Sequence, residues 1–221
     1  MSGTLQIKTY PEPPLCRKEI LRYAGCREAD TDVLARMESC WQEIREGLKY
    51  RACIRELPVD ITGDECDFAM FRLRSRQLAR NLEGCRRMLL FAATIGVEID
   101  RKIARYGRIS PSKALWFQAI GAERIEALCD AVCAEFAREG QWGLRPRFSP
   151  GYGDLPLTAQ REIFSVLDCT KQIGVSLSDS LLMLPSKSVT AFVGLAENGE
   201  RNLIPRCTAC KMIDCEFRGA L

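Results

Sequence analysis

The sequence predicts an α+β fold, a single domain in which helices pack against a mixed or antiparallel sheet. Three observations indicate this class. Apolar residues recur at helical spacing in some segments and alternate in others, and the two kinds of segment follow one another in irregular order. The chain has 221 residues, enough for one large domain with a substantial core. It contains 47% hydrophobic and 28% charged residues, which excludes a disordered or fibrous protein.

The beginning of the chain carries strand and helix patterns in turn. Residues Leu5–Tyr10 alternate and predict a short strand, which the following prolines close. Arg17–Ala24 predicts a short helix, and a longer helix with an apolar stripe at helical spacing follows Thr31. Tyr50–Ile61 alternates again, and Pro58 predicts an edge position for this strand because proline has no N–H to donate.

The middle of the chain contains a buried strand and the clearest helix. Ser75 is a cap residue and predicts the start of a short helix. Met88–Thr94 is a continuous apolar run, which is typical of a strand buried on both faces. Ser110 followed by Pro111 predicts the start of a long helix, whose apolar stripe continues until Gly140 ends it.

The C-terminal part begins with a loop rich in glycine, proline and aromatic residues, from Trp142 to Pro156. It leads into a helix around Ile163–Leu167. Leu181–Leu184 and Val189–Leu195 have strand-like patterns, and the short polar connection between them predicts a hairpin.

Two counts restrict the chemistry: 12 cysteines and no histidine. Without histidine, Ser–His and Cys–His catalytic pairs, HExxH metalloprotease sites and histidine-ligated metals are excluded. The N-terminus lacks the features of a signal peptide, and the longest apolar stretch is about half the length of a membrane span. We therefore expect a cytoplasmic protein with no membrane partner, whose nine cysteines from Cys16 to Cys169 are reduced packing residues.

The most informative motif is Arg147-Phe-Ser-Pro-Gly-Tyr152. It combines a fixed planar cation, a glycine that lets the backbone approach a ligand, and an aromatic face. This set suits a ligand with a carboxylate, an aromatic base and a cationic centre that the tyrosine ring would favour. The alternative is a structural loop in which glycine and proline only set the turn geometry.

This motif and the residues after it resemble the reactivation domain of cobalamin-dependent methionine synthase. The similarity is specific from about Leu144 to Leu195, and weaker before it, where the chain looks like the separate short versions of the family. The resemblance divides the chain into an activation-domain-like part at 1–195, most specific at 144–195, and a cysteine-containing tail at 196–221. The matching residues are, in order, Arg147, Gly151, Tyr152, Pro156, Leu157, Ile173, Gly174, Val175, Leu177, Ser180, Met183, Pro185, Ser188 and Val189.

The resemblance implies a binding site for S-adenosylmethionine formed by Arg147, Gly151 and Tyr152. In this family the arginine anchors the ligand, and the tyrosine lies near the methyl group and the corrinoid face. A glutamate on the preceding helix also contacts the ligand, and Glu126 is the best match. The alternative for Glu126 is an exposed helix charge beside two other acidic residues.

The resemblance also implies a reaction and its partners. The family restores an oxidised corrinoid by reductive methylation, in which one electron and the methyl of S-adenosylmethionine regenerate methylcobalamin. We expect a stand-alone reactivation subunit, with the cobalamin carried by a methionine synthase or another corrinoid protein and the electron supplied by a donor such as flavodoxin or ferredoxin. The rival interpretation is a non-catalytic adaptor that docks on a corrinoid protein, or a metal-binding scaffold, without S-adenosylmethionine binding.

The tail contains three closely spaced cysteines, Cys207, Cys210 and Cys215, near several cations. Cations favour the thiolate form, and a C-x-x-C pair can hold zinc or the iron of an iron–sulfur centre. The alternatives are redox-active thiols and a tail without a metal. The sequence therefore predicts zinc or an iron–sulfur centre as a candidate cofactor of this tail.

A basic run lies between Arg72 and Arg87. The net charge of only +3 argues against a nucleic-acid partner. We interpret the run as a solvated face or a docking surface for an acidic partner.

Overall fold

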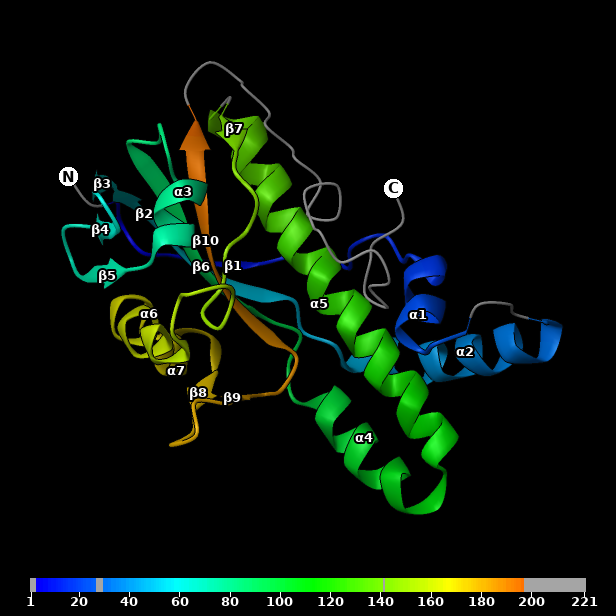
Figure 1. The fold of residues 1–221 in the computed structure, drawn as a ribbon. Coiled ribbons are helices and arrows are strands. Elements are labelled where there is room, and N and C mark those ends of the chain that lie inside the picture. Colours follow the sequence, from blue (N-terminus) through cyan, green and yellow to red (C-terminus); the bar gives the residue numbers. More distant parts are fainter. Residues whose placement is uncertain (1–2, 27–29, 141, 197–221) are drawn as a thin grey trace.

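The computed structural model describes residues 3–26, 30–140 and 142–196. Their centre is a five-stranded sheet in which every neighbouring pair is antiparallel. This architecture confirms the predicted α+β class with an antiparallel sheet (Figure 1). The strands, in spatial order, are β1 (Gln6–Thr9), β2 (Arg51–Pro58), β6 (Arg87–Thr94), β10 (Ser188–Ala196) and β7 (Gly143–Leu144).

The middle of the sheet is the predicted buried strand. Residues 88–94 of β6 are all buried because β2 and β10 flank the strand and helices cover both faces. The edge position predicted for β2 is wrong, since β2 lies between β1 and β6. β1 pairs only with residues 51–54 of β2, so Pro58 stands beyond the end of β1, where its missing N–H costs no ladder hydrogen bond.

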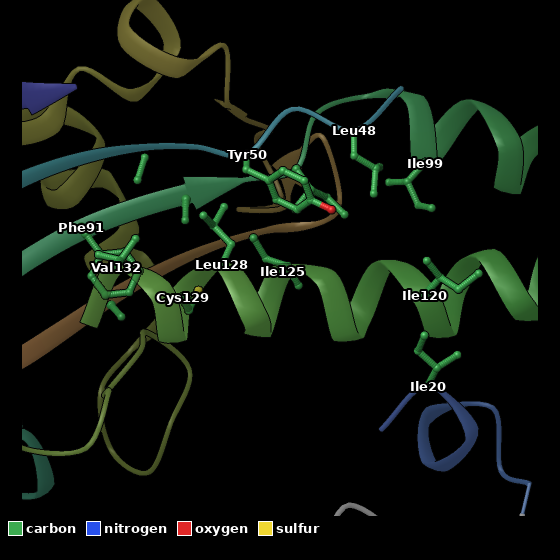
Figure 2. Close-up of a cluster of buried hydrophobic side chains, with 14 of the residues drawn as sticks. Ile20, Leu48, Tyr50, Phe91, Ile99, Ile120, Ile125, Leu128, Cys129 and Val132 are labelled. Carbon is green, nitrogen blue, oxygen red and sulfur yellow. The ribbon is translucent and has the colours of Figure 1, made fainter. Parts of the chain in front are cut away.

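One face of the sheet is covered by four helices, of which α5 (Pro111–Gly140) is the longest. The others are α1 (Arg17–Tyr23), α2 (Thr31–Ile44) and α4 (Glu98–Ile109). Figure 2 shows Ile125 and Leu128 pointing from α5 towards the strands, while Ile20 of α1 lies on another side of the helix. Because α5 packs on the sheet and on its neighbouring helices, its first half is buried on more than the single predicted stripe.

Short helices cover the opposite face: α3 (Arg76–Asn81), α6 (Gln160–Leu167) and α7 (Cys169–Ile173). The predicted cap is present, since the Ser75 hydroxyl accepts a hydrogen bond from the Leu78 N–H. A second hydrophobic core forms between these helices and the sheet, so β6 and β10 contribute side chains to both cores. A small separate sheet contains β3 (Asp60–Thr62), β4 (Glu65–Asp67) and β5 (Arg72–Arg74), and Arg45–Gly47 and Leu157–Ala159 form single-turn 3₁₀ helices.

The predicted hairpin at the C-terminal end is wrong. The first predicted strand, Leu181–Leu184, contains β9 (Met183–Leu184), which pairs with β8 (Ser176–Leu177). The second predicted strand, Val189–Leu195, lies within β10, which pairs with β6 and β7. The polar connection therefore links two different sheets. A long apolar strand such as β10 is stabilised inside the sheet, where helices cover both of its faces.

The nine cysteines before the tail divide into three groups. Six are buried, as predicted for packing residues, and two are half-buried beside the core. Cys16 is exposed, so the prediction is wrong for it: it precedes α1 on the surface. In the described part of the chain, no helix has the length and apolar character needed to cross a membrane.

Candidate functional site

The loop that carries the Arg147–Tyr152 motif is attached to the central sheet. The backbone groups of Phe148 and Phe192 exchange two hydrogen bonds of 2.9 and 2.8 Å, which form an isolated antiparallel bridge with β10. The side chain of Phe192 is fully buried in the core. The sheet therefore holds the residue next to Arg147 in a fixed position.

A tight turn follows this anchor point. Gly151 has a φ of 88°, a left-handed conformation that L side chains rarely adopt, so this position requires glycine. The turn is closed by hydrogen bonds from the Gly151 N–H to the Leu155 carbonyl (2.9 Å) and from the Tyr152 N–H to the Ser149 carbonyl (3.0 Å). As a result the Tyr152 side chain stays on the surface, 47% exposed, with its ring edge-on to that of Phe148.

Arg147 forms ion pairs with two carboxylates of α5. Its Nη2 lies 2.6 Å from Glu126 Oε2, and its Nη1 donates to Asp130 Oδ1. Glu126 and Asp130 are four residues apart and therefore lie on the same side of the helix. Burial alone would lower the pKa of the Arg147 guanidinium, but the ionisable groups of Cys129, Asp130 and Glu126 around it raise this pKa instead. The guanidinium thus stays charged at any physiological pH.

A cavity of about 170 Å³ opens beside this ion pair. Gln160, the first residue of α6, contributes to its wall and is only 5% exposed. Within the described part of the chain, the Gln160 Oε1 atom is buried without a hydrogen-bond partner. The cavity is lined by Glu126, Arg147, Ser149, Pro150, Tyr152, Gln160, Met183, Ser188, Val189 and Thr190.

A larger groove of about 550 Å³ runs along α5 on the other side of Glu126. Its walls come from α1, from the residues before α1 and from α5, and they include Tyr23 and Asp130. Burial, followed by the negative charge of Glu126, raises the pKa of the Tyr23 hydroxyl. Glu126 therefore lines both the cavity and the groove.

The structure brings together three of the four predicted ligand-binding side chains. Arg147, Glu126 and Tyr152 line the same cavity, while Gly151 shapes the turn between them. The Glu126 side chain is 38% exposed and pairs with Arg147. Sequence reasoning missed Gln160, which no motif marks.

The predicted metal ligands Cys207, Cys210 and Cys215 lie outside the described residues. Within residues 3–26, 30–140 and 142–196, no group of three or more Cys, Asp or Glu side chains is arranged to hold a metal ion.

Comparisons with known proteins agree with this geometry. One solved structure, the crystal structure of the MetH reactivation domain bound to AdoHcy, has the same fold with a TM-score of 0.62 at 14% sequence identity. The similarity covers 87% of this chain and 78% of that one. No curated protein sequence matches the chain. The family model for the activation domain of vitamin B12-dependent methionine synthase matches residues 80–209, more than half of the chain, and includes every residue of the cavity. The chain therefore belongs to the family of vitamin B12-dependent methionine synthase activation domains.

Proposed function

We propose that this chain binds S-adenosylmethionine in the cavity beside Arg147 and presents its methyl group to the reduced corrinoid of a partner protein. The observation that carries the proposal is the convergence of Arg147, Glu126 and Tyr152 on one cavity in a member of this family. The similar reactivation domain was crystallised with AdoHcy, the product that S-adenosylmethionine leaves after losing its methyl group. This supports the same class of ligand here.

The charges of the site suit this ligand. Arg147 contributes one positive charge, and Glu126 and Asp130 contribute two negative charges. S-adenosylmethionine has a carboxylate, an ammonium group and a sulfonium centre, so its net charge is positive while that of the cluster is negative. The Arg147 guanidinium can bind the carboxylate of the ligand, and the carboxylates of Glu126 and Asp130 can bind the cationic groups of the ligand. One small cluster therefore offers a partner to each charged group of the ligand.

The arrangement supports methyl transfer through positioning rather than through proton transfer. Tyr152 is the exposed aromatic side chain at the cavity, and it lies on a turn whose hydrogen bonds and anchor strand fix it. A ring in this position would favour the sulfonium centre and direct the methyl outwards. The reduced corrinoid of the partner would supply the nucleophile for the methyl cation, and S-adenosylhomocysteine would be the product left on this chain. The protein contributes alignment of the donor methyl with that nucleophile.

The partners follow from this chemistry. We propose that the corrinoid is carried by a cobalamin-dependent methionine synthase or a related corrinoid protein, with this chain as a separate subunit in the cytoplasm. An oxidised corrinoid needs one electron before it accepts a methyl cation, so a low-potential donor of the flavodoxin or ferredoxin class is the second partner.

We also propose zinc or an iron–sulfur centre at Cys207, Cys210 and Cys215. Metal analysis and an absorption spectrum of anaerobically purified protein test this last point, and a preparation with neither zinc nor iron contradicts it.

The proposed reaction is tested with methyl-labelled S-adenosylmethionine and cobalamin reduced anaerobically with titanium(III) citrate. We expect the wild-type protein to accelerate the appearance of labelled methylcobalamin, and Arg147→Ala to abolish this acceleration. Arg138→Ala is the matched control, because Arg138 is exposed near the end of α5 and lies outside the cavity. Ligand binding without acceleration would contradict methyl transfer, and absence of both would favour the non-catalytic adaptor.

A further inference from the structure

Gln160 has a position that the fold alone does not require. Its side chain is buried at the start of α6, and the residue lines the cavity that Arg147 and Tyr152 also line. Among the described residues, its Oε1 atom has no hydrogen-bond partner. Buried amide oxygens in folded proteins are almost always paired, because leaving one without a donor is unfavourable. An unpaired acceptor at a cavity wall therefore indicates a donor that arrives with a ligand.

The polar neighbours of Gln160 in the cavity do not supply this donor. The Ser188 Oγ atom lies 2.9 Å from Thr94 Oγ1 and 2.8 Å from the Pro185 carbonyl oxygen, so its single hydrogen is used within the chain. The Arg147 guanidinium donates to Glu126 and Asp130. These two neighbours therefore leave the buried Gln160 acceptor unpaired, and an uncharged donor on a ligand can pair with it.

The donor and acceptor atoms of the amide indicate which group of the ligand Gln160 would recognise. A glutamine side chain presents an acceptor and a donor side by side, and this pair matches the exocyclic amine and the adjacent ring nitrogen of adenine. Met183 and Tyr152 line the same cavity and offer a polarisable and an aromatic surface to the flat faces of a base. The cationic groups of an adenosyl ligand are better placed at the carboxylates of Glu126 and Asp130. We propose that Gln160 recognises the adenine of the ligand by accepting a hydrogen bond from its exocyclic amine; this inference rests on the proposed function.

The test compares S-adenosylhomocysteine with S-inosylhomocysteine by calorimetric titration. The second compound carries a carbonyl oxygen where adenine has its amine, so it faces the Gln160 oxygen with an acceptor instead of a donor. We expect the wild-type protein to bind S-inosylhomocysteine about tenfold more weakly, the range for one lost hydrogen bond. Gln160→Met keeps the length of the side chain and removes the amide. It is expected to bind S-adenosylhomocysteine about tenfold more weakly than the wild type and to distinguish the two compounds little.

The control is Gln118→Met, at an exposed glutamine of α5, which is expected to behave as the wild type. Circular dichroism and thermal unfolding check that each variant is folded. If Gln160→Met keeps the full preference for the adenosyl compound, the inference is overturned. The inference is also overturned if Gln160→Met loses the wild-type preference for S-adenosylhomocysteine over its 2′- or 3′-deoxy analogue. In that case the Gln160 amide contacts the ribose. Failure of the wild-type protein to bind S-adenosylhomocysteine overturns the proposed function together with the inference.

Discussion

At the scale of single residues, the site depends on the pairing of Arg147 with Glu126. The two side chains come from segments 21 residues apart and meet because β10 anchors the loop beside α5. The Glu126 side chain is 38% exposed, so its charge reaches the hollows on both sides of it. This carboxylate is well placed to act on the charge of a ligand.

The first prediction concerns this charge. Glu126→Gln is expected to weaken binding of S-adenosylmethionine more than binding of S-adenosylhomocysteine, because only the former carries the sulfonium charge. We expect the ratio of the two dissociation constants to change by about fivefold, corresponding to roughly 1 kcal/mol for a partly exposed charge pair. Calorimetry with both ligands measures this ratio, and Glu162→Gln, at an exposed position of α6, is the control. Equal weakening of both ligands would show that Glu126 does not face the sulfonium.

The residues of the site differ in how far the sequence reveals them. Arg147, Gly151 and Tyr152 belong to one short motif, and glycine at a left-handed turn has a physical reason that a sequence can indicate. Glu126 was found only through the family resemblance. Asp130 is not among the predicted site residues, although its spacing of four residues from Glu126 is a usable signal. Gln160 has no such signal, because its burial depends on how α6 packs on the sheet.

At the scale of elements, a buried ion pair fixes the segment before α1 to the long helix α5. Arg124 is fully buried, pairs with Glu123, and donates hydrogen bonds of 2.7 Å to the carbonyl groups of Pro13 and Pro14. Glu123 in turn accepts a hydrogen bond from the Cys16 N–H. These contacts hold one wall of the groove beside the site.

The second prediction follows from this arrangement. Arg124→Met removes the cation and leaves the Glu123 carboxylate, only 3% exposed, without its buried partner. We expect a loss of about 3 kcal/mol in the free energy of unfolding, since breaking a buried pair from one side leaves an uncompensated charge. Urea unfolding measures the loss. Arg138→Met at an exposed position of the same helix is expected to cost less than about 0.5 kcal/mol, and an equal cost for both variants would contradict the role of the buried pair.

Glu43 connects α2 to α4 and α5. Its carboxylate accepts hydrogen bonds from Lys102 Nζ (2.7 Å), Tyr106 Oη (2.8 Å) and Lys113 Nζ (3.4 Å). Burial alone would raise the pKa of Glu43, but these donors outweigh it and lower the pKa to about 2. The pKa is thus lower in the folded than in the unfolded state, so the ionised carboxylate stabilises the fold at neutral pH.

The third prediction is a pH dependence. The stabilisation by Glu43 is fully present above the ordinary glutamate pKa of about 4.5 and is lost as the pH falls to about 2. Glu43→Gln is therefore expected to be less stable than the wild type by about 1 kcal/mol at pH 7, with the difference vanishing towards pH 2. Urea unfolding at several pH values tests this. A difference that stays constant down to pH 2 would contradict it.

Most elements are predicted from local patterns, and the errors have a common cause. The caps at Ser75 and Ser110 and the apolar run of β6 are local signals, and each led to the correct element. The edge assignment of β2 and the hairpin before β10 failed because strand pairing joins residues that are far apart in the chain. Helix α4 was missed, although Ile99, Ile103 and Tyr106 recur along it at helical spacing and pack on the core.

At the scale of the whole molecule, the sheet separates two hydrophobic cores and contributes to both. Phe91 of β6 is fully buried on the side of α5 (Figure 2), and Phe192 of β10 is fully buried on the opposite side. The two residues lie on neighbouring paired strands. We propose that the described residues unfold as one cooperative domain.

The fourth prediction tests this cooperativity. Phe91→Ala and Phe192→Ala each leave a large cavity, with an expected cost of about 3–5 kcal/mol. Each is expected to lower a single thermal transition by roughly 10 °C in a chain of this size. Differential scanning calorimetry that instead shows two transitions, with each variant shifting only one, would contradict a single domain.

The central claim, that the cavity beside Arg147 binds S-adenosylmethionine, is tested most directly by calorimetric titration of the full chain with this compound. The account predicts a single binding site in the wild-type protein, binding that is abolished or weakened at least tenfold in Arg147→Ala, and unchanged affinity in Arg138→Ala. Absence of binding to the wild type, or equal binding to the wild type and Arg147→Ala, would contradict it.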